Sequence, residues 1–358
     1  MTDTDNYIYR QQDSPDFGYR LRKGEIAIEL DNETLFNLKA STLFGIPELL
    51  LSEEDGHCPR LFSVKSHSDN ILETIHYDQI RVDICHYDTG FHIGKHIAEL
   101  LILLDNILIH KMDQQSERQK LSNRYCKVFY RLVDQLGAYY NDLKFPWLEE
   151  LYKGGLSSIT YTKGKALYST FSTEVQSATN NHFKQLDSYV KEYPPGTYIC
   201  REGESGNELY ILKQGRLQVV IKDHKISEIS RSGAIVGDMI FWLGGDRTAS
   251  LKTIEKTSMV VIHKSDLQKI MSVDHKFLKT LAINLSRRVL RHCVAIERIN
   301  REIEEGAPST LKEKDELKDL KNTLSVLSVE HSDLDWLHDM YQAIHTEFEK
   351  LEESDHSR

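Results

Sequence analysis

The chain has 358 residues, of which 40% are hydrophobic and 28% are charged, and its formal net charge is −10. This length predicts more than one domain, and this balance is typical of a soluble globular protein. The longest apolar run, near residues 97–109, contains Glu99 and Asp105, so we expect no segment that spans a membrane.

The spacing of the cysteines and the character of the N-terminal residues indicate the cellular compartment of the protein. The five cysteines (58, 85, 126, 200 and 293) follow no spacing typical of a disulfide framework. The N-terminus is acidic and lacks the apolar core of a signal peptide. We therefore expect a cytoplasmic protein with reduced thiols.

The N-terminal segment has a counterpart farther along the chain, which indicates a duplication. Residues 7–24 align without a gap with residues 198–215, and residues 60–80 align with residues 247–267. The identities include Tyr7, Arg10, Tyr19, Leu21 and Gly24, which fall on Tyr198, Arg201, Tyr210, Leu212 and Gly215. Each copy shows short strands joined by turns, as in a barrel or jelly roll.

A helical segment separates the two copies. Leucines and isoleucines recur at helical spacing over residues 92–140, and Gly154-Gly155 indicates a linker ahead of the second copy. Cys85, His86, His92, His96 and Glu99 raise a metal site as an alternative. Because Gly94 separates the two histidines and no glutamate follows the first, we expect no metal.

The second copy carries the residues best suited to binding a ligand, and they lie in the run from Val236 to Ser250. An arginine fork together with backbone N–H groups at a helix start would bind an anion such as a phosphate group. Arg247 supplies the fork, and a short helix over residues 238–243 supplies the N–H groups. The alternative is a surface arginine that pairs with Asp246 or Asp238.

This run resembles the phosphate-binding cassette of the tandem cyclic-nucleotide-binding domain family, which includes cAMP-receptor-like and kinase-regulatory-subunit-like proteins. Glu202-Gly203-Glu204-Ser205-Gly206 also resembles that family's turn, and the likeness extends over roughly residues 183–301. It implies that the carboxylate of Asp238 binds the ribose 2′-hydroxyl, where the family has a longer glutamate. The expected ligand-binding residues are Gly237, Asp238, Met239, Ile240, Arg247, Thr248, Ala249 and Ser250.

The first copy departs from this pattern. Phe44-Gly45 and Arg60 echo the cassette, but Gln12 replaces the first turn glycine and Phe62 should block a phosphate. We expect this copy to be structural.

The segment after the second copy is helical and acidic. A helix over residues 277–305 ends at Gly306-Ala-Pro308, and Ser309 or Thr310 could cap the next one. Residues 311–351 repeat leucines among lysines and glutamates, which predicts a helical hairpin or coiled coil, although a core-facing tail is equally plausible. Most of the acidic excess lies here, so we expect no nucleic-acid partner.

The predicted fold class is mixed α+β, with two jelly-roll cyclic-nucleotide-binding modules joined and followed by α-helices. The predicted domains are a degenerate jelly roll (1–90), a helical connector (91–165), a nucleotide-binding domain with helices (166–305) and an acidic tail (306–358). We interpret the chain as a cytoplasmic sensor of cAMP or cGMP, with neither enzymatic activity nor a membrane or metal partner. It would signal through helix rearrangement to a protein partner or through self-association. A ligand-free scaffold is the alternative, and a kinase-inhibiting regulatory subunit ranks last.

Overall fold

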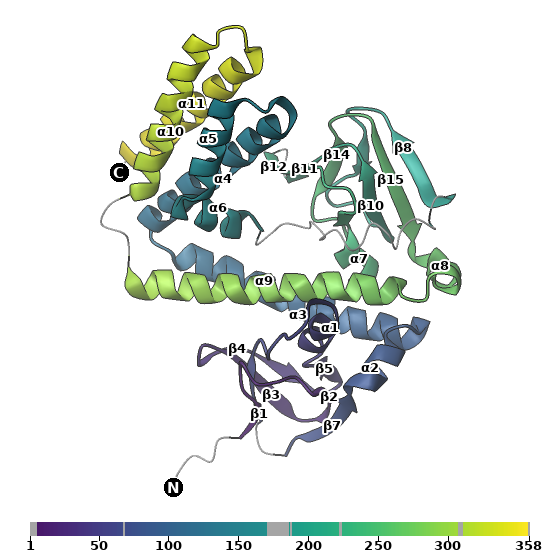
Figure 1. Ribbon diagram of the computed structural model, residues 1–358. Helices are drawn as coiled ribbons and strands as arrows, with labels where there is room; N and C mark the ends of the chain where they lie inside the picture. Colours follow the sequence, from purple (N-terminus) through teal and green to yellow (C-terminus); the bar gives the residue numbers. More distant parts are fainter. Residues whose placement is uncertain are drawn as a thin grey trace. The chain divides into compact units, whose positions relative to one another are not determined.

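A computed structural model (Figure 1) describes residues 6–66, 69–169, 186, 188–221, 224–306 and 311–356. The predicted cap residues Ser309 and Thr310 lie outside this range. The chain divides into two compact units, which are described separately. The first comprises Met1–Ile107 and Thr173–Cys293, and the second comprises Leu108–Ser172 and Val294–Arg358.

The first unit begins with an antiparallel jelly roll. Its elements are β1 (Tyr7–Tyr9), β2 (Phe17–Lys23), β3 (Glu25–Leu30), β4 (Glu33–Lys39), β5 (Thr42–Phe44), α1 (Pro47–Asp55), β6 (Ser63–Ser66) and β7 (Ile71–His76). They form a four-stranded sheet in the order β1-β6-β3-β4 and a three-stranded sheet in the order β5-β2-β7. Leu21 of the second sheet and Ile26, Leu30 and Val64 of the first have no exposed surface and belong to the core.

A second jelly roll follows in the same unit. It consists of β8 (Val190–Tyr193), β9 (Tyr198–Cys200), β10 (Glu208–Gln214), β11 (Leu217–Ile221), β12 (His224–Ile229), β13 (Ile235–Val236), α7 (Asp238–Leu243), β14 (Ser250–Thr253) and β15 (Thr257–His263). Its sheets run β12-β11-β14-β9 and β13-β10-β15-β8. Apart from β8, the order and pairing repeat those of the first jelly roll. The mixed α+β fold with jelly-roll modules is confirmed.

The backbone repeats as well. Gly24 and Gly215 adopt φ of 96° and 104°, and Gly45 and Gly237 adopt 68° and 80°. Gln12 has φ of 74°, close to the 80° of Gly203, so the first copy keeps the turn although it has lost the glycine. The absence of that glycine alone therefore does not distinguish the two copies.

Helices complete the first unit. They are α2 (Tyr77–Asp83), most of α3 (Tyr87–Gln114), the short 3-10 helix η2 (Lys264–Asp266), α8 (Leu267–Val273) and the first part of α9 (Phe277–Glu305). Trp242 of α7 is 1% exposed, and its ring centroid lies 5.0 Å from that of Phe91 on α3. The six-residue helix α7 is thus anchored by its aromatic side chains.

The second unit is helical. It contains the ends of α3 and α9 together with α4 (Glu117–Leu143), α5 (Pro146–Leu156), α6 (Ile159–Ser169), α10 (Lys312–Glu330) and α11 (Asp335–His356). Tyr125, Leu132, Leu317, Leu324 and Phe348 belong to one buried cluster that joins α4 to the α10–α11 hairpin. The leucine repeat of the tail therefore faces this core, which is the alternative that the sequence left open.

The linker predicted at Gly154-Gly155 is wrong, because both glycines lie inside α5. A Cβ atom at position 155 would lie 2.6 Å from the Val133 side chain, so Gly155 permits close packing of α5 on α4. Among the described residues, no helix combines the length and apolar character that a membrane crossing requires.

The contact between α3 and α7 generates a prediction. A Cβ atom at position 94 would lie 2.3 Å from the Trp242 ring, so Gly94→Ala should destabilise the protein by about 1–3 kcal/mol through overpacking. Gly154→Ala, on a helix with no atom within 4 Å of the added Cβ, should be neutral or stabilising by up to about 1 kcal/mol. Chemical denaturation of both variants checks this; equal stabilities would contradict it.

Candidate functional site

The cassette predicted from the sequence is a compact structural element. Gly237, with φ of 80°, turns the chain from β13 into α7, which begins at Asp238 as expected. Ile240, Phe241 and Trp242 point into the protein and fix the helix. The loop after α7 returns through Arg247 to β14, so the eight predicted residues lie on one continuous turn–helix–loop segment.

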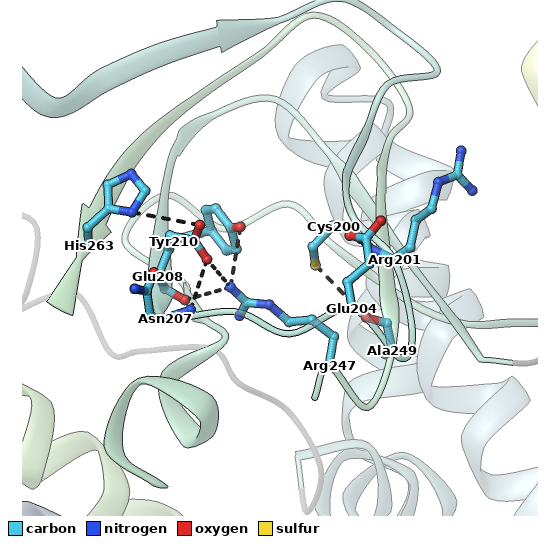
Figure 2. Close-up of polar contacts among 9 residues, drawn as sticks. All are labelled: Cys200, Arg201, Glu204, Asn207, Glu208, Tyr210, Arg247, Ala249 and His263. Atoms are coloured by element: carbon cyan, nitrogen blue, oxygen red, sulfur yellow. Dashed lines mark hydrogen bonds and ion pairs between the residues drawn. The ribbon is translucent and has the colours of Figure 1, made fainter. Parts of the chain in front are cut away.

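The guanidinium of Arg247 is turned into the protein, and its side chain is only 4% exposed (Figure 2). Its Nη2 atom donates to the backbone oxygen of Glu208 at 2.9 Å, to Oε2 of Glu208 at 2.7 Å and to the hydroxyl of Tyr210 at 3.4 Å. Its carbon Cζ also lies 5.1 Å from the centroid of the Tyr210 ring. The arginine thus ties the cassette to the start of β10.

Two glycines make room for this arginine. A Cβ atom at position 206 would lie 2.6 Å from Nε and Nη2 of Arg247, and one at position 237 would lie 2.5 Å from Nη1. The Nη1 atom itself is buried and has no hydrogen-bond partner among the described residues. A buried donor without an acceptor costs free energy, so a free acceptor beside Gly237 would be bound favourably.

Glu208 is the charged partner that the sequence did not identify. Burial raises its pKa, but hydrogen bonds from the backbone and the charge of Arg247 outweigh this effect and lower the pKa overall. Burial raises the pKa of the Tyr210 hydroxyl, and the charge of Arg247 opposes that rise. The network therefore holds a half-buried, ionised carboxylate and a buried, neutral phenol around one guanidinium.

Asp238 is also paired within the protein. It is 8% exposed, and its Oδ1 and Oδ2 atoms lie 3.2 and 2.9 Å from Nη1 of Arg288, on the part of α9 that belongs to the first unit. Asp246 instead accepts a hydrogen bond from the Ser205 hydroxyl at 2.7 Å. The alternative in which Arg247 pairs with Asp246 or Asp238 is therefore wrong.

The remaining predicted residues differ in exposure. Thr248 is exposed, Met239, Ala249 and Ser250 are half-buried, and Ile240 is buried. The hydroxyl of Ser250 accepts a hydrogen bond from the amide of Glu202 at 2.9 Å. The loop at residues 201–206 is joined to the cassette a second time, because the Gly203 amide donates to the Arg247 carbonyl and the Arg247 amide to the Glu204 carbonyl, both at 2.8 Å.

The first jelly roll holds its own arginine differently. Arg60 is 1% exposed and donates to the carbonyl oxygens of Gly45, at 3.0 Å, and Phe17. Its Cζ lies 4.2 Å from the centroid of the Tyr9 ring. Phe62, expected to obstruct a phosphate, is 3% exposed. That this copy is structural stays a prediction.

The histidine cluster on α3 offers little to a metal. Nε2 of His92 and Nε2 of His96 lie 3.2 Å apart, and Nδ1 of His96 lies 3.0 Å from Glu99. Burial and the neighbouring His92 lower the pKa of His96. Within the described ranges, no group of three or more histidine, cysteine or acidic side chains could hold a metal ion.

Comparison with known proteins identifies the second jelly roll. Residues 190–274 match the profile of the cyclic nucleotide-binding domain. The chain is 29% identical over 162 residues to a cyclic nucleotide-gated channel of Caenorhabditis elegans. The aligned stretch covers 41% of this chain and 21% of the channel. It is 33% identical over 91 residues to cyclic nucleotide-gated channel alpha-4 of Mus musculus, covering 22% of this chain and 15% of the channel. The chain thus spans about a fifth or less of these relatives.

Solved structures give weaker likenesses. The regulatory domain of Toxoplasma gondii PKA with cAMP aligns over 76% of this chain and 80% of its own, at 15% identity and a TM-score of 0.22. The regulatory subunit of a cAMP-independent protein kinase A from Trypanosoma brucei aligns over 80% and 75%, at 17% identity and a TM-score of 0.26. Scores this low carry no argument about function.

The pairing of Glu208 generates a pH prediction. Because its folded pKa is lowered, its contribution to stability is present above the ordinary glutamate pKa of about 4.3 and is lost as the pH falls through the folded value. The free energy of unfolding should therefore fall more between pH 6 and pH 3 in the wild type than in Glu208→Gln. Urea titrations across this range check it, and parallel curves for the two proteins would contradict the pairing.

Proposed function

We propose that the second jelly roll is a sensor of a cyclic nucleotide, with cAMP as the first candidate and cGMP as the second. The observation that carries the proposal is the buried Nη1 atom of Arg247 beside Gly237, which has no hydrogen-bond partner in the part of the chain that the structure describes. A cyclic phosphate oxygen is a charged acceptor and would satisfy this donor. The match of residues 190–274 to the cyclic nucleotide-binding domain supports the same ligand class.

Ligand binding then competes with contacts inside the protein. The phosphate would share Arg247 with Glu208, and the ribose 2′-hydroxyl would compete with Arg288 for Asp238. Gly237, Met239, Ile240, Thr248, Ala249 and Ser250 would complete the site. The competition lowers affinity, but it also links the occupied site to the rest of the protein.

Arg288 provides the link to a signal. It stands on α9, so a ligand that draws Asp238 away removes a charged contact between the cassette and this helix. The helices α8 and α9 would then repack, with one of their apolar side chains covering the base. A ligand shifts such an equilibrium only by its different affinities for the two arrangements.

The output would be a protein partner or self-association in the cytoplasm, without a catalytic step of this chain. In the α10–α11 hairpin, Val326 and Val329 are 57% and 76% exposed, and they offer apolar contacts to such a partner. A partner that recognises the acidic C-terminal helices would complete the pathway.

A ligand-free scaffold is the second candidate. It is favoured by the pairing of both key side chains, Arg247 with Glu208 and Asp238 with Arg288. In that case the two ion pairs would only hold α7 in place, and nucleotide would change nothing.

Thermal unfolding with cAMP or cGMP separates the two candidates. A ligand at a hundred times its dissociation constant should add about 2.7 kcal/mol to the stability of the domain that binds it. Arg247→Ala should abolish this gain, whereas Arg216→Ala, which removes an exposed arginine paired with Glu255, should preserve it. No response in the wild type to either nucleotide would favour the scaffold.

A ligand pair tests the role of Asp238. The wild type should bind 2′-deoxy-cAMP, which lacks the ribose 2′-hydroxyl, about 1.5–3 kcal/mol more weakly than cAMP. This is the usual contribution of a hydrogen bond to a charged group. In Asp238→Asn the difference between cAMP and 2′-deoxy-cAMP should shrink. Calorimetric titration measures all four affinities. An undiminished difference in the variant would assign the hydroxyl to another residue.

A further inference from the structure

A cavity of about 370 Å³ lies within the helical unit. Its walls come from the last residues of α3, the first turns of α4, Leu167 of α6 and the end of α9. This volume lies in the range of sites for small molecules.

Four cationic side chains line this cavity: Lys120, Arg124, Lys127 and Arg298. Two acidic residues, Asp113 and Glu117, also line it, but Glu117 already pairs with Lys120 at 3.0 Å. Glu302, one helical turn after Arg298, lies 3.7 Å from its Nε and also accepts from Gln115. The lining therefore has an excess of positive charge.

Lys127 stands close to other cations in this lining. It is half-buried, and the charges that act on its pKa come from Arg298 and Arg124, with no carboxylate among them. Burial lowers its pKa, and the charges of Arg298 and Arg124 lower it further. Burial also lowers the pKa of Arg298, although Glu302 opposes the change. Like charges held close together repel one another, and burial disfavours each charge. An anion bound between these cations would offset both the repulsion and the cost of burial.

The rest of the wall is apolar. Leu108, Met112, Leu167 and Ile299 face the same space, and Leu167 is 9% and Ile299 2% exposed. Arginine forks and a lysine would bind an oxyanion, and these side chains would cover an attached hydrocarbon part.

We propose that this cavity binds a small organic anion, with a phosphate or carboxylate group held by Lys127, Arg124 and Arg298 and an apolar body against the aliphatic wall. The proposal is independent of nucleotide binding. The residues belong to the second compact unit, whereas Arg247 and Asp238 belong to the first.

Calorimetric titration of the full chain with phenyl phosphate at constant ionic strength tests the site. The probe combines an oxyanion with an apolar ring. Lys127→Gln should weaken its affinity about tenfold or more, the loss expected of a charged hydrogen bond. Lys318→Gln, on an exposed position of α10, should leave the affinity unchanged. Without the probe, Lys127→Gln should melt at or above the wild-type temperature, because repulsion falls.

Two further titrations, one with the Arg247→Ala variant and one with inorganic phosphate, determine where and how phenyl phosphate binds. Binding should persist in Arg247→Ala, and inorganic phosphate should bind more weakly than phenyl phosphate because it lacks the ring. The proposal is overturned if phenyl phosphate does not bind or if Lys127→Gln binds it as the wild type does. It also fails if Arg247→Ala removes binding, which would assign the anion to the cassette. Equal affinities for the two phosphates would contradict the apolar half of the site.

Discussion

A buried arginine holds the cassette of the second jelly roll against its sheet. Arg247 contacts Glu208 and Tyr210 through one nitrogen, and this contact determines several other features. A Cβ atom at position 206 or 237 would meet the guanidinium in its present position, and Gly237 also adopts a φ of 80° that favours glycine. The charge of Arg247 helps to lower the pKa of Glu208, which keeps this carboxylate ionised at neutral pH. Among the described residues Nη1 of Arg247 has no hydrogen-bond partner, so it is available to an external acceptor.

The first jelly roll has the same framework but different contacts around its arginine. Arg60 is equally buried, but its Nη atoms donate to backbone carbonyl oxygens, its Cζ lies over the Tyr9 ring, and its charge opposes the rise of the Glu48 pKa. Glu48, at 1% exposure, is close enough to accept from the Leu61 amide, and burial raises its pKa. The two copies thus share strand order and turns while differing in the electrostatics around the arginine.

Local sequence was sufficient for the jelly-roll character of the strands and for the bounds of α7, because these depend on alternation, turn glycines or short spacing. It was not sufficient for Glu208 or Arg288, which lie 39 and 50 residues from their partners and meet them only through the fold. Gly154-Gly155 was misread as a linker because a glycine that permits helix packing looks the same in sequence as one that breaks a helix. The cationic cavity is lined by four helices. Lys120, Arg124 and Lys127 recur at helical spacing on α4, but Leu167 and Arg298 come from parts of the chain that no local pattern connects to them.

The central claim is that ligand competes with Glu208 and Arg288 for the two charged residues of the cassette. Hydrogen–deuterium exchange with and without cAMP tests it most directly, because amide exchange reports local opening of each segment. The account predicts slower exchange over residues 237–250, where ligand binds, and faster exchange in the turn of α9 around Arg288, where a contact is lost. Exchange that is unchanged in both segments at a saturating concentration would contradict the account.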